Sequence, residues 1–199
     1  MRKSRLAVLT AGVTLLVAGL LAPPSSAATK PTSVTINLTA VVDIVDNPNG
    51  VPVGDIAPGD VITGSYTYNP KTNDINPFKQ AGDYPHNQQP YGIQLNLGSF
   101  SVATDETNVD FQIAIFNGSD SDSYRVTSFH NVGTTEPGPG VQLISWNLMD
   151  PTGTALSNAA LNKTAPVLSS WQFNQLDIEG RDDAPYLIRA HVTQAVKVS

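Results

Sequence analysis

A pair of carboxylates is the first feature of this sequence that could do chemistry. Asp177 and Glu179 stand two positions apart, so both side chains lie on the same face of an extended segment. Hydrolysis of a glycosidic bond needs two carboxyl groups that face each other across a cleft. The pair therefore supports the hypothesis of a hydrolase acting on extracellular polysaccharide, although most pairs of this kind are only surface charges.

A second group of oxygen ligands lies in the turn 117–123. Asp120 and Asp122 alternate there with serines, and calcium prefers carboxylate and carbonyl oxygens. The two aspartates are candidates for a metal site, although the glycine and the distal glutamate of an EF-hand loop are missing. A plain turn is the favoured interpretation, and calcium-dependent adhesion is the alternative.

The other common catalytic patterns are absent from the sequence. His86, His130 and His191 lack the short spacing of a legible metal site, and we expect them to be surface histidines. There is no Gly-x-Ser-x-Gly elbow, no phosphate-binding glycine loop and no cysteine. We therefore expect no cofactor, and we favour a protein that is not an enzyme.

Four aromatic residues are candidates for ligand binding, because an aromatic ring offers a flat apolar face to a sugar. They are Tyr84, His86, Tyr91 and Trp171. Tyr84 lies in the proline-containing segment 69–90, which we expect to be a long loop with Tyr84 as its most exposed aromatic side chain.

The first 28 residues read as a secretory signal peptide. Arg2, Lys3 and Arg5 precede the apolar stretch 6–21, and small residues at 25–28 offer a cleavage site. We expect residues 29–199 to form a single domain, secreted by a bacterial route, with no membrane span after cleavage. That part has 8 basic and 17 acidic residues, a net charge of −9, which disfavours nucleic acid as a partner.

Alternating side chains predict an all-β fold. In Val61–Tyr68, the residues Ile62, Tyr66 and Tyr68 share one side, and Gly64 on that side suggests a bulge or a close backbone approach. Similar segments recur between turn signals with almost no helical period. We expect an antiparallel two-sheet sandwich, jelly-roll-like, with about eight to ten strands and little helix. The long first and last strands should pair as neighbours.

Three passages and the C-terminal segment resemble a known group of proteins. The passages are Gly64-Ser65-Tyr66-Thr67-Tyr68, then Gly82-Asp83-Tyr84-Pro85-His86 with Pro90-Tyr91-Gly92, then Trp146–Gly153, and the chain closes with Ile188-Arg189-Ala190-His191-Val192-Thr193. This order is similar to uncharacterised bacterial exported proteins of the PEP-CTERM-associated type. The resemblance implies a signal peptide and an all-β body, and it implies no activity or site residue. Those proteins commonly end in a sorting tail that is not found here.

Together these features predict a secreted, non-enzymatic β-protein with a binding or structural role outside the cytoplasm. A glycan or a matrix component is the expected partner. The alternative is the polysaccharide hydrolase with paired carboxylates. The oligomeric state of the protein stays open under both hypotheses.

Overall fold

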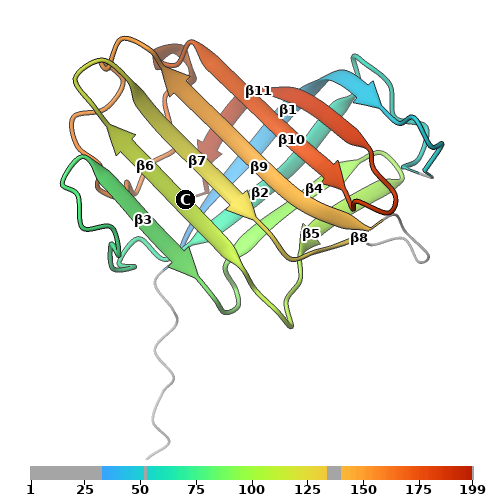
Figure 1. Ribbon diagram of the computed structural model, residues 1–199, viewed down its shortest axis with the longest axis horizontal. Coiled ribbons are helices and arrows are strands. Elements are labelled where there is room, and N and C mark those ends of the chain that lie inside the picture. Colours follow the sequence, from blue (N-terminus) through green and yellow to red (C-terminus); the bar gives the residue numbers. More distant parts are fainter. Residues whose placement is uncertain (1–32, 52, 134–139, 199) are drawn as a thin grey trace, which may run out of the picture. The chain divides into compact units, whose positions relative to one another are not determined.

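The computed structural model describes residues 33–51, 53–133 and 140–198, which belong to one compact unit spanning Pro31–Ser199 (Figure 1). The predicted signal peptide, residues 1–28, lies outside the described residues. No helix in the described part of the chain is long and apolar enough to cross a membrane.

The described residues form eleven strands and one short 3₁₀ helix, which confirms the all-β prediction. The elements in chain order are β1 (Val34–Asp46), β2 (Val61–Tyr68), β3 (Ala81–His86), β4 (Gly92–Leu97), β5 (Phe100–Thr104), β6 (Phe111–Asn117), β7 (Asp122–Ser128), β8 (Asn131–Gly133), β9 (Val141–Asp150), η1 (Leu168–Ser170), β10 (Phe173–Gly180) and β11 (Leu187–Lys197).

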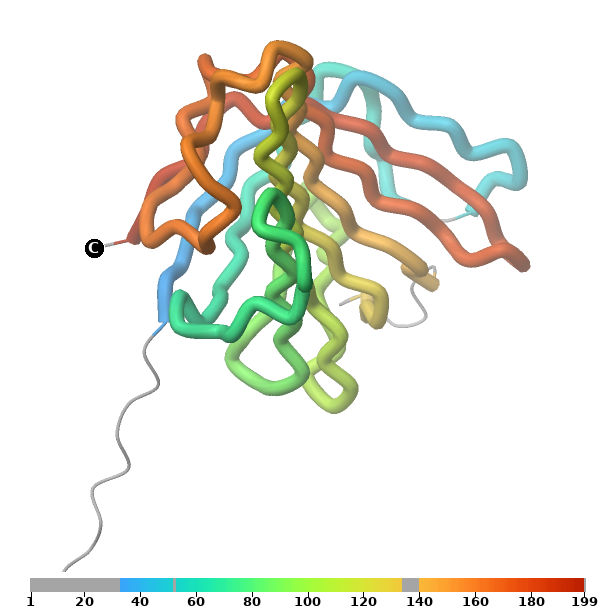
Figure 2. The backbone as a smooth tube through the Cα atoms, turned by 60° about the vertical axis from the view of Figure 1, so that its left-hand side comes forward, coloured from blue at the N-terminus to red at the C-terminus, as the bar shows by residue number. Residues whose placement is uncertain are grey.

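All eleven strands belong to one antiparallel sheet, in the order β3-β6-β7-β9-β10-β11-β1-β2-β4-β5-β8. The prediction of a two-sheet, jelly-roll-like sandwich with eight to ten strands is therefore wrong. The sheet curls into a half-barrel so that its two halves face each other, as Figures 1 and 2 show. Strand alternation requires one buried face per strand, and a curled single sheet meets this requirement as well as two stacked sheets do.

The first and last strands pair as predicted. β1 lies between β11 and β2, and its register with β11 runs from Ile36 opposite Lys197 to Asp46 opposite Leu187. Register shifts interrupt this pairing between Thr39 and Ala40 and again between Val42 and Ile44. Irregularities of this kind increase local twist, which favours the curl of the sheet.

Aromatic side chains fill the space between the two halves of the sheet. Tyr66 on β2 lies across the interior from Tyr124 on β7 and Trp146 on β9, with ring centroids 6.0 Å apart for Tyr66 and Trp146. Tyr68 stacks on Tyr66 at 5.8 Å. Because these rings come from both halves of the sheet, they hold the curl closed.

Gly64 lies where two backbones approach closely. The sequence suggested either a bulge or a close backbone approach at this position. A Cβ atom there would lie 2.1 Å from the carbonyl oxygen of Gln94 and 2.9 Å from Cα of Leu95 on β4. The register of β2 with β1 and with β4 is continuous at this residue, so there is no bulge.

The segment 69–90 is not one long loop, because it contains the edge strand β3. The preceding residues cover the free edge of β3: the Ile75 amide donates to the Asp83 carbonyl at 3.0 Å, and the Asp83 amide donates to Oδ1 of Asp74 at 2.9 Å. Pro85 has no N–H to offer. The segment therefore protects an edge that would otherwise be open to pairing with another chain.

A second long segment, 151–172, closes one side of the half-barrel, visible in orange in Figure 2. Buried side chains from the sheet hold its backbone. The hydroxyl of Tyr68 donates to the Asn162 carbonyl at 2.5 Å, and Oδ2 of Asp122 accepts a hydrogen bond from the Leu156 amide at 2.7 Å. Burial raises the pKa of Tyr68 to about 12, so this hydroxyl keeps the proton that it donates.

Candidate functional site

The four predicted ligand-binding aromatics are all buried. Tyr84, His86, Tyr91 and Trp171 are 5%, 3%, 7% and 9% exposed. The prediction that Tyr84 is the most exposed aromatic is wrong, because alternation along β3 turns its ring inward and its hydroxyl donates to the Ala159 carbonyl at 2.7 Å. His86 and Tyr91 touch, with ring centroids 5.1 Å apart, and Trp171 lies apart from them in the segment 151–172.

His86 links the end of β2 to the end of β3. Its Nε2 atom accepts a hydrogen bond from the Asn69 amide at 3.0 Å and lies 3.0 Å from Oγ1 of Thr72. Burial lowers the pKa of His86 from its ordinary value of 6.5, and accepting from an amide requires an unprotonated Nε2. The expectation of a surface histidine is wrong here, because the ring packs against Tyr91 and Phe111.

The other two histidines are exposed and lie in separate places. Nδ1 of His191 is 2.8 Å from Oδ1 of Asp43, and Nδ1 of His130 is 3.8 Å from Oδ2 of Asp110. Within the described ranges, no group of three or more histidine or carboxylate side chains is arranged to hold a metal ion.

The two aspartates considered for calcium have different surroundings. Asp120 is exposed, whereas Asp122 is fully buried at the start of β7 and accepts the hydrogen bond from Leu156 already described. The carboxylate of Asp122 therefore holds the segment 151–172 in place. An aspartate side chain that accepts a hydrogen bond from a backbone amide is common where the chain turns.

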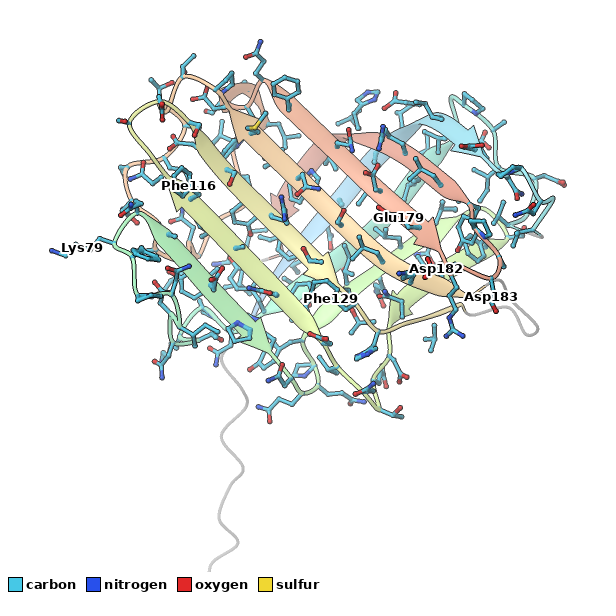
Figure 3. All side chains as sticks on the ribbon, in the orientation of Figure 1. Lys79, Phe116, Phe129, Glu179, Asp182 and Asp183 are labelled. Atoms are coloured by element: carbon cyan, nitrogen blue, oxygen red, sulfur yellow. The ribbon has the colours of Figure 1, made fainter. Side chains whose placement is uncertain are left out.

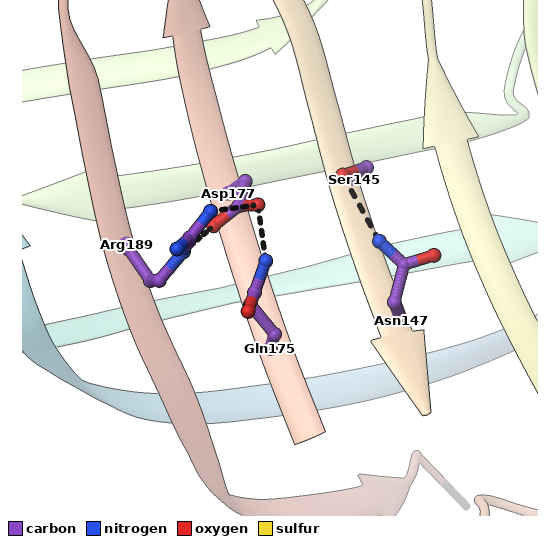
Figure 4. Close-up of polar contacts among 5 residues, drawn as sticks. All are labelled: Ser145, Asn147, Gln175, Asp177 and Arg189. Carbon is purple, nitrogen blue, oxygen red and sulfur yellow. Dashed lines mark hydrogen bonds and ion pairs between the residues drawn. The ribbon is translucent and has the colours of Figure 1, made fainter. Parts of the chain in front are cut away.

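The carboxylate pair lies on the outer face of the sheet. Asp177 is 5% exposed, because Nε of Arg189 contacts its Oδ1 at 2.9 Å and Nε2 of Gln175 donates to its Oδ2 at 2.6 Å (Figure 4). Glu179 lies on the same face (Figure 3). Partial burial raises the pKa of Glu179, and the charge of Asp177 adds to this effect. Neither carboxylate lines the groove described next or the pocket beneath the segment 151–172.

A groove with a volume of about 190 Å³ opens over β2, β4 and β5, where the sheet meets the segment 89–91. Gln89 and Pro90, at the end of the segment 69–90, form part of its wall. The lining residues are Ser65, Thr67, Gln89, Pro90, Tyr91, Gly92, Ile93, Gln94, Ala103, Thr104 and Glu106.

Small residues create the hollow. Gly92 has a φ of +150°, and a Cβ atom at this position would lie 2.7 Å from the side chain of Thr104. Glycine is needed because Oγ1 of Thr104 must reach the Ile93 amide, from which it accepts a hydrogen bond of 2.9 Å. Ala103, opposite Gln94 in the register, also has a short side chain. The longer side chains that line the groove therefore surround a shallow depression.

The rim of the groove offers hydrogen-bonding groups. Nε2 of Gln89 donates to Oε2 of Glu106 at 3.0 Å, which joins two sides of the rim. Ser65 and Gln94 face each other in the register of β2 and β4, and their side chains make no hydrogen bond to any described residue. The groove can therefore bind a ligand through amide and hydroxyl groups and a single carboxylate.

Sequence reasoning missed most of this groove. Alternation could have placed Ser65 and Gln94 on the outward sides of their strands, since Ile93 and Tyr66 face inward. No local signal places β2 beside β4, because β3 lies between them in the chain and pairs elsewhere. Only Tyr91, among the predicted aromatics, lines the groove.

Comparisons of the chain with protein-family models, with curated proteins and with solved structures found no match. The fold and the groove themselves define the class: an all-β protein with one curled antiparallel sheet and a polar groove on its outer face.

Proposed function

We propose that this chain is an exported, non-enzymatic β-protein that binds a neutral polysaccharide through the groove over β2, β4 and β5. The observation that carries the proposal is the lining of the groove, with amides and hydroxyls at its rim and no basic side chain. Sugar hydroxyls both donate and accept hydrogen bonds, and amide and hydroxyl side chains do the same.

The charge distribution supports a neutral ligand. β2, β4 and β5 contain no charged residue, although the sequence as a whole has 17 acidic and 11 basic residues. A polyanion would gain nothing from this surface and would be repelled by the rest of the acidic protein. An uncharged glycan avoids that repulsion and can use the free side chains of Ser65 and Gln94.

The test uses residues 29–199 and a panel of neutral and anionic polysaccharides, in affinity electrophoresis and titration calorimetry. We expect binding to at least one neutral polysaccharide, and we expect the double variant Ser65→Ala, Gln94→Ala to weaken it about tenfold. The matched control is Gln80→Ala, which removes an exposed amide far from the groove. Absence of binding to every neutral polysaccharide, or equal binding by the double variant, would refute the proposal.

The hydrolase alternative lacks a supporting observation. Its two carboxylates would have to face each other across a cleft, and Asp177 is instead engaged by Arg189. Release of reducing sugar by the wild type, abolished in the Asp177→Asn variant, would restore this alternative.

Export is a further part of the proposal. It is supported by the basic and apolar pattern of residues 1–28 and by the resemblance to exported PEP-CTERM-type proteins. The N-terminal sequence of the protein recovered from the culture medium or periplasm of a bacterial host would test it, with a mature start near residue 28 or 29 as the expected result.

A further inference from the structure

A second pocket lies between β7 and the segment 151–172, apart from the groove. It has a volume of about 130 Å³, and Tyr124, Leu156, Val167 and Trp171 are among its lining residues. The segment that covers it is held by hydrogen bonds from buried side chains, including those of Tyr68 and Asp122. The pocket is thus part of the fixed architecture of the protein.

Tyr124, one of the lining residues, carries a hydroxyl group that can donate a hydrogen bond. The hydroxyls of Tyr66 and Tyr124 are 3.1 Å apart, and only one of them can donate to the other. Tyr66 is fully buried, so its hydroxyl hydrogen would have no acceptor if Tyr124 were the donor. An unpaired hydroxyl hydrogen on Tyr66 would therefore cost more free energy than an unpaired hydroxyl hydrogen on Tyr124. Donation from Tyr66 to Tyr124 avoids this cost. It leaves the hydroxyl hydrogen of Tyr124 without an acceptor among the described residues.

A second donor comes from the wall. The indole N–H of Trp171 makes no hydrogen bond to any residue that the structure describes, although the residue is only 9% exposed. The other tryptophan, Trp146, donates from its indole to Oδ1 of Asn174 at 2.9 Å. The N–H of Trp171 is therefore free to donate to a bound group.

The remaining walls determine the character of the ligand. Leu156, Ala165, Pro166 and Val167 provide apolar contact, and Asn162, Thr164 and Ser170 add neutral polar groups. No charged side chain is among the described residues that line the pocket. An ionic group would lose its hydration there without gaining a counter-charge. The volume of about 130 Å³ admits a group of a few heavy atoms and excludes a longer chain.

We propose that this pocket binds an acetamido group, as carried by an N-acetylated sugar. The methyl group would contact the apolar walls, and the carbonyl oxygen would accept from the hydroxyl of Tyr124 or the indole of Trp171. The pocket lies apart from the polysaccharide groove, so this inference does not depend on the proposed function.

The test records the indole resonances of ¹⁵N-labelled protein, residues 29–199, during titration with N-acetylglucosamine. Two such resonances are expected because the sequence contains two tryptophans, and a Trp171→Phe variant assigns them. We expect a saturable shift of the Trp171 indole, little change at Trp146, and a dissociation constant in the millimolar range that is common for a single sugar. Glucose, which lacks the acetamido group, should produce no saturable shift.

Two variants make the result specific. Tyr124→Phe removes the donor and should weaken binding about three- to tenfold. Since it also leaves Tyr66 without a partner, a second variant, Ala165→Leu, should fill the pocket and abolish binding while the melting temperature is maintained. The control Ala160→Leu changes an exposed alanine of the same segment outside the pocket. No saturable shift, an equal shift with glucose, or unchanged binding by Ala165→Leu would overturn the proposal.

Discussion

Asp177 on β10 and Arg189 on β11 form a two-point ion pair on the outer face of the sheet. Nε of Arg189 lies 2.9 Å from Oδ1 and Nη2 lies 3.2 Å from Oδ2 of the carboxylate. Gln175 adds a hydrogen bond of 2.6 Å to Oδ2. Because both oxygens have donors, the carboxylate can be almost completely buried.

Removal of the arginine should leave Asp177 buried without its counter-charge. We expect Arg189→Met to lower the free energy of unfolding by about 1–3 kcal/mol, a discounted value because Arg189 is itself about one-third exposed. Urea denaturation at neutral pH measures it. The control is Arg125→Met, where an exposed arginine loses only a neutral amide partner, Asn147. Equal effects of the two variants would contradict this role for the ion pair.

Loss of a single hydroxyl should loosen the segment 151–172. Tyr84→Phe removes the buried hydrogen bond to Ala159, and we expect a loss of about 1–2 kcal/mol and faster proteolysis within the segment. Tyr91→Phe is the matched control, since the hydroxyl of Tyr91 makes no hydrogen bond to a described residue. The prediction fails if cleavage of the segment is equally fast in both variants.

The stability of the protein should fall as the pH drops below about 6.5 because of His86. The folded-state pKa is lowered by burial, so the unfolded chain takes up the proton first. This contribution is complete above the ordinary pKa of 6.5 and is lost as the pH falls from there towards the folded-state pKa, by at most about 1.4 kcal/mol per pH unit. Chemical denaturation between pH 7.5 and pH 5 measures the slope.

The variant His86→Gln should be less stable at neutral pH and should show a smaller slope over this interval. His130→Gln, which removes an exposed imidazole, serves as the control. A wild-type slope that survives in His86→Gln would assign the pH dependence to other groups.

A side chain at position 64 should disrupt the pairing of β2 with β4. We expect Gly64→Ala to cost about 1–3 kcal/mol, because the added carbon would collide with the backbone of β4 at Gln94 and Leu95. Thr63→Ala, at the neighbouring exposed position, should stay within about 0.5 kcal/mol of the wild type. Thermal and urea unfolding compare the two, and a well-tolerated alanine at position 64 would show that β4 can move away.

Much of the local structure could be predicted because it depends on neighbouring residues. The alternation of Ile62, Tyr66 and Tyr68 predicted which side of β2 is buried, and all three are at most 2% exposed. Tyr84 was misplaced for the opposite reason: a proline at position 85 suggests a loop, yet an edge strand tolerates proline because one side of it needs no sheet partner.

The sequence by itself determined that the chain forms strands, which side of a clearly alternating strand such as β2 is buried, and that the long first and last strands are neighbours. The tertiary structure alone decided that the strands form one curled sheet, that Ser65 faces Gln94 across β2 and β4, and that Tyr124 and Trp171 line one pocket. The physical reason is the range of the interactions. Alternation acts over two residues, whereas strand order and pocket formation depend on contacts between segments that lie tens of residues apart.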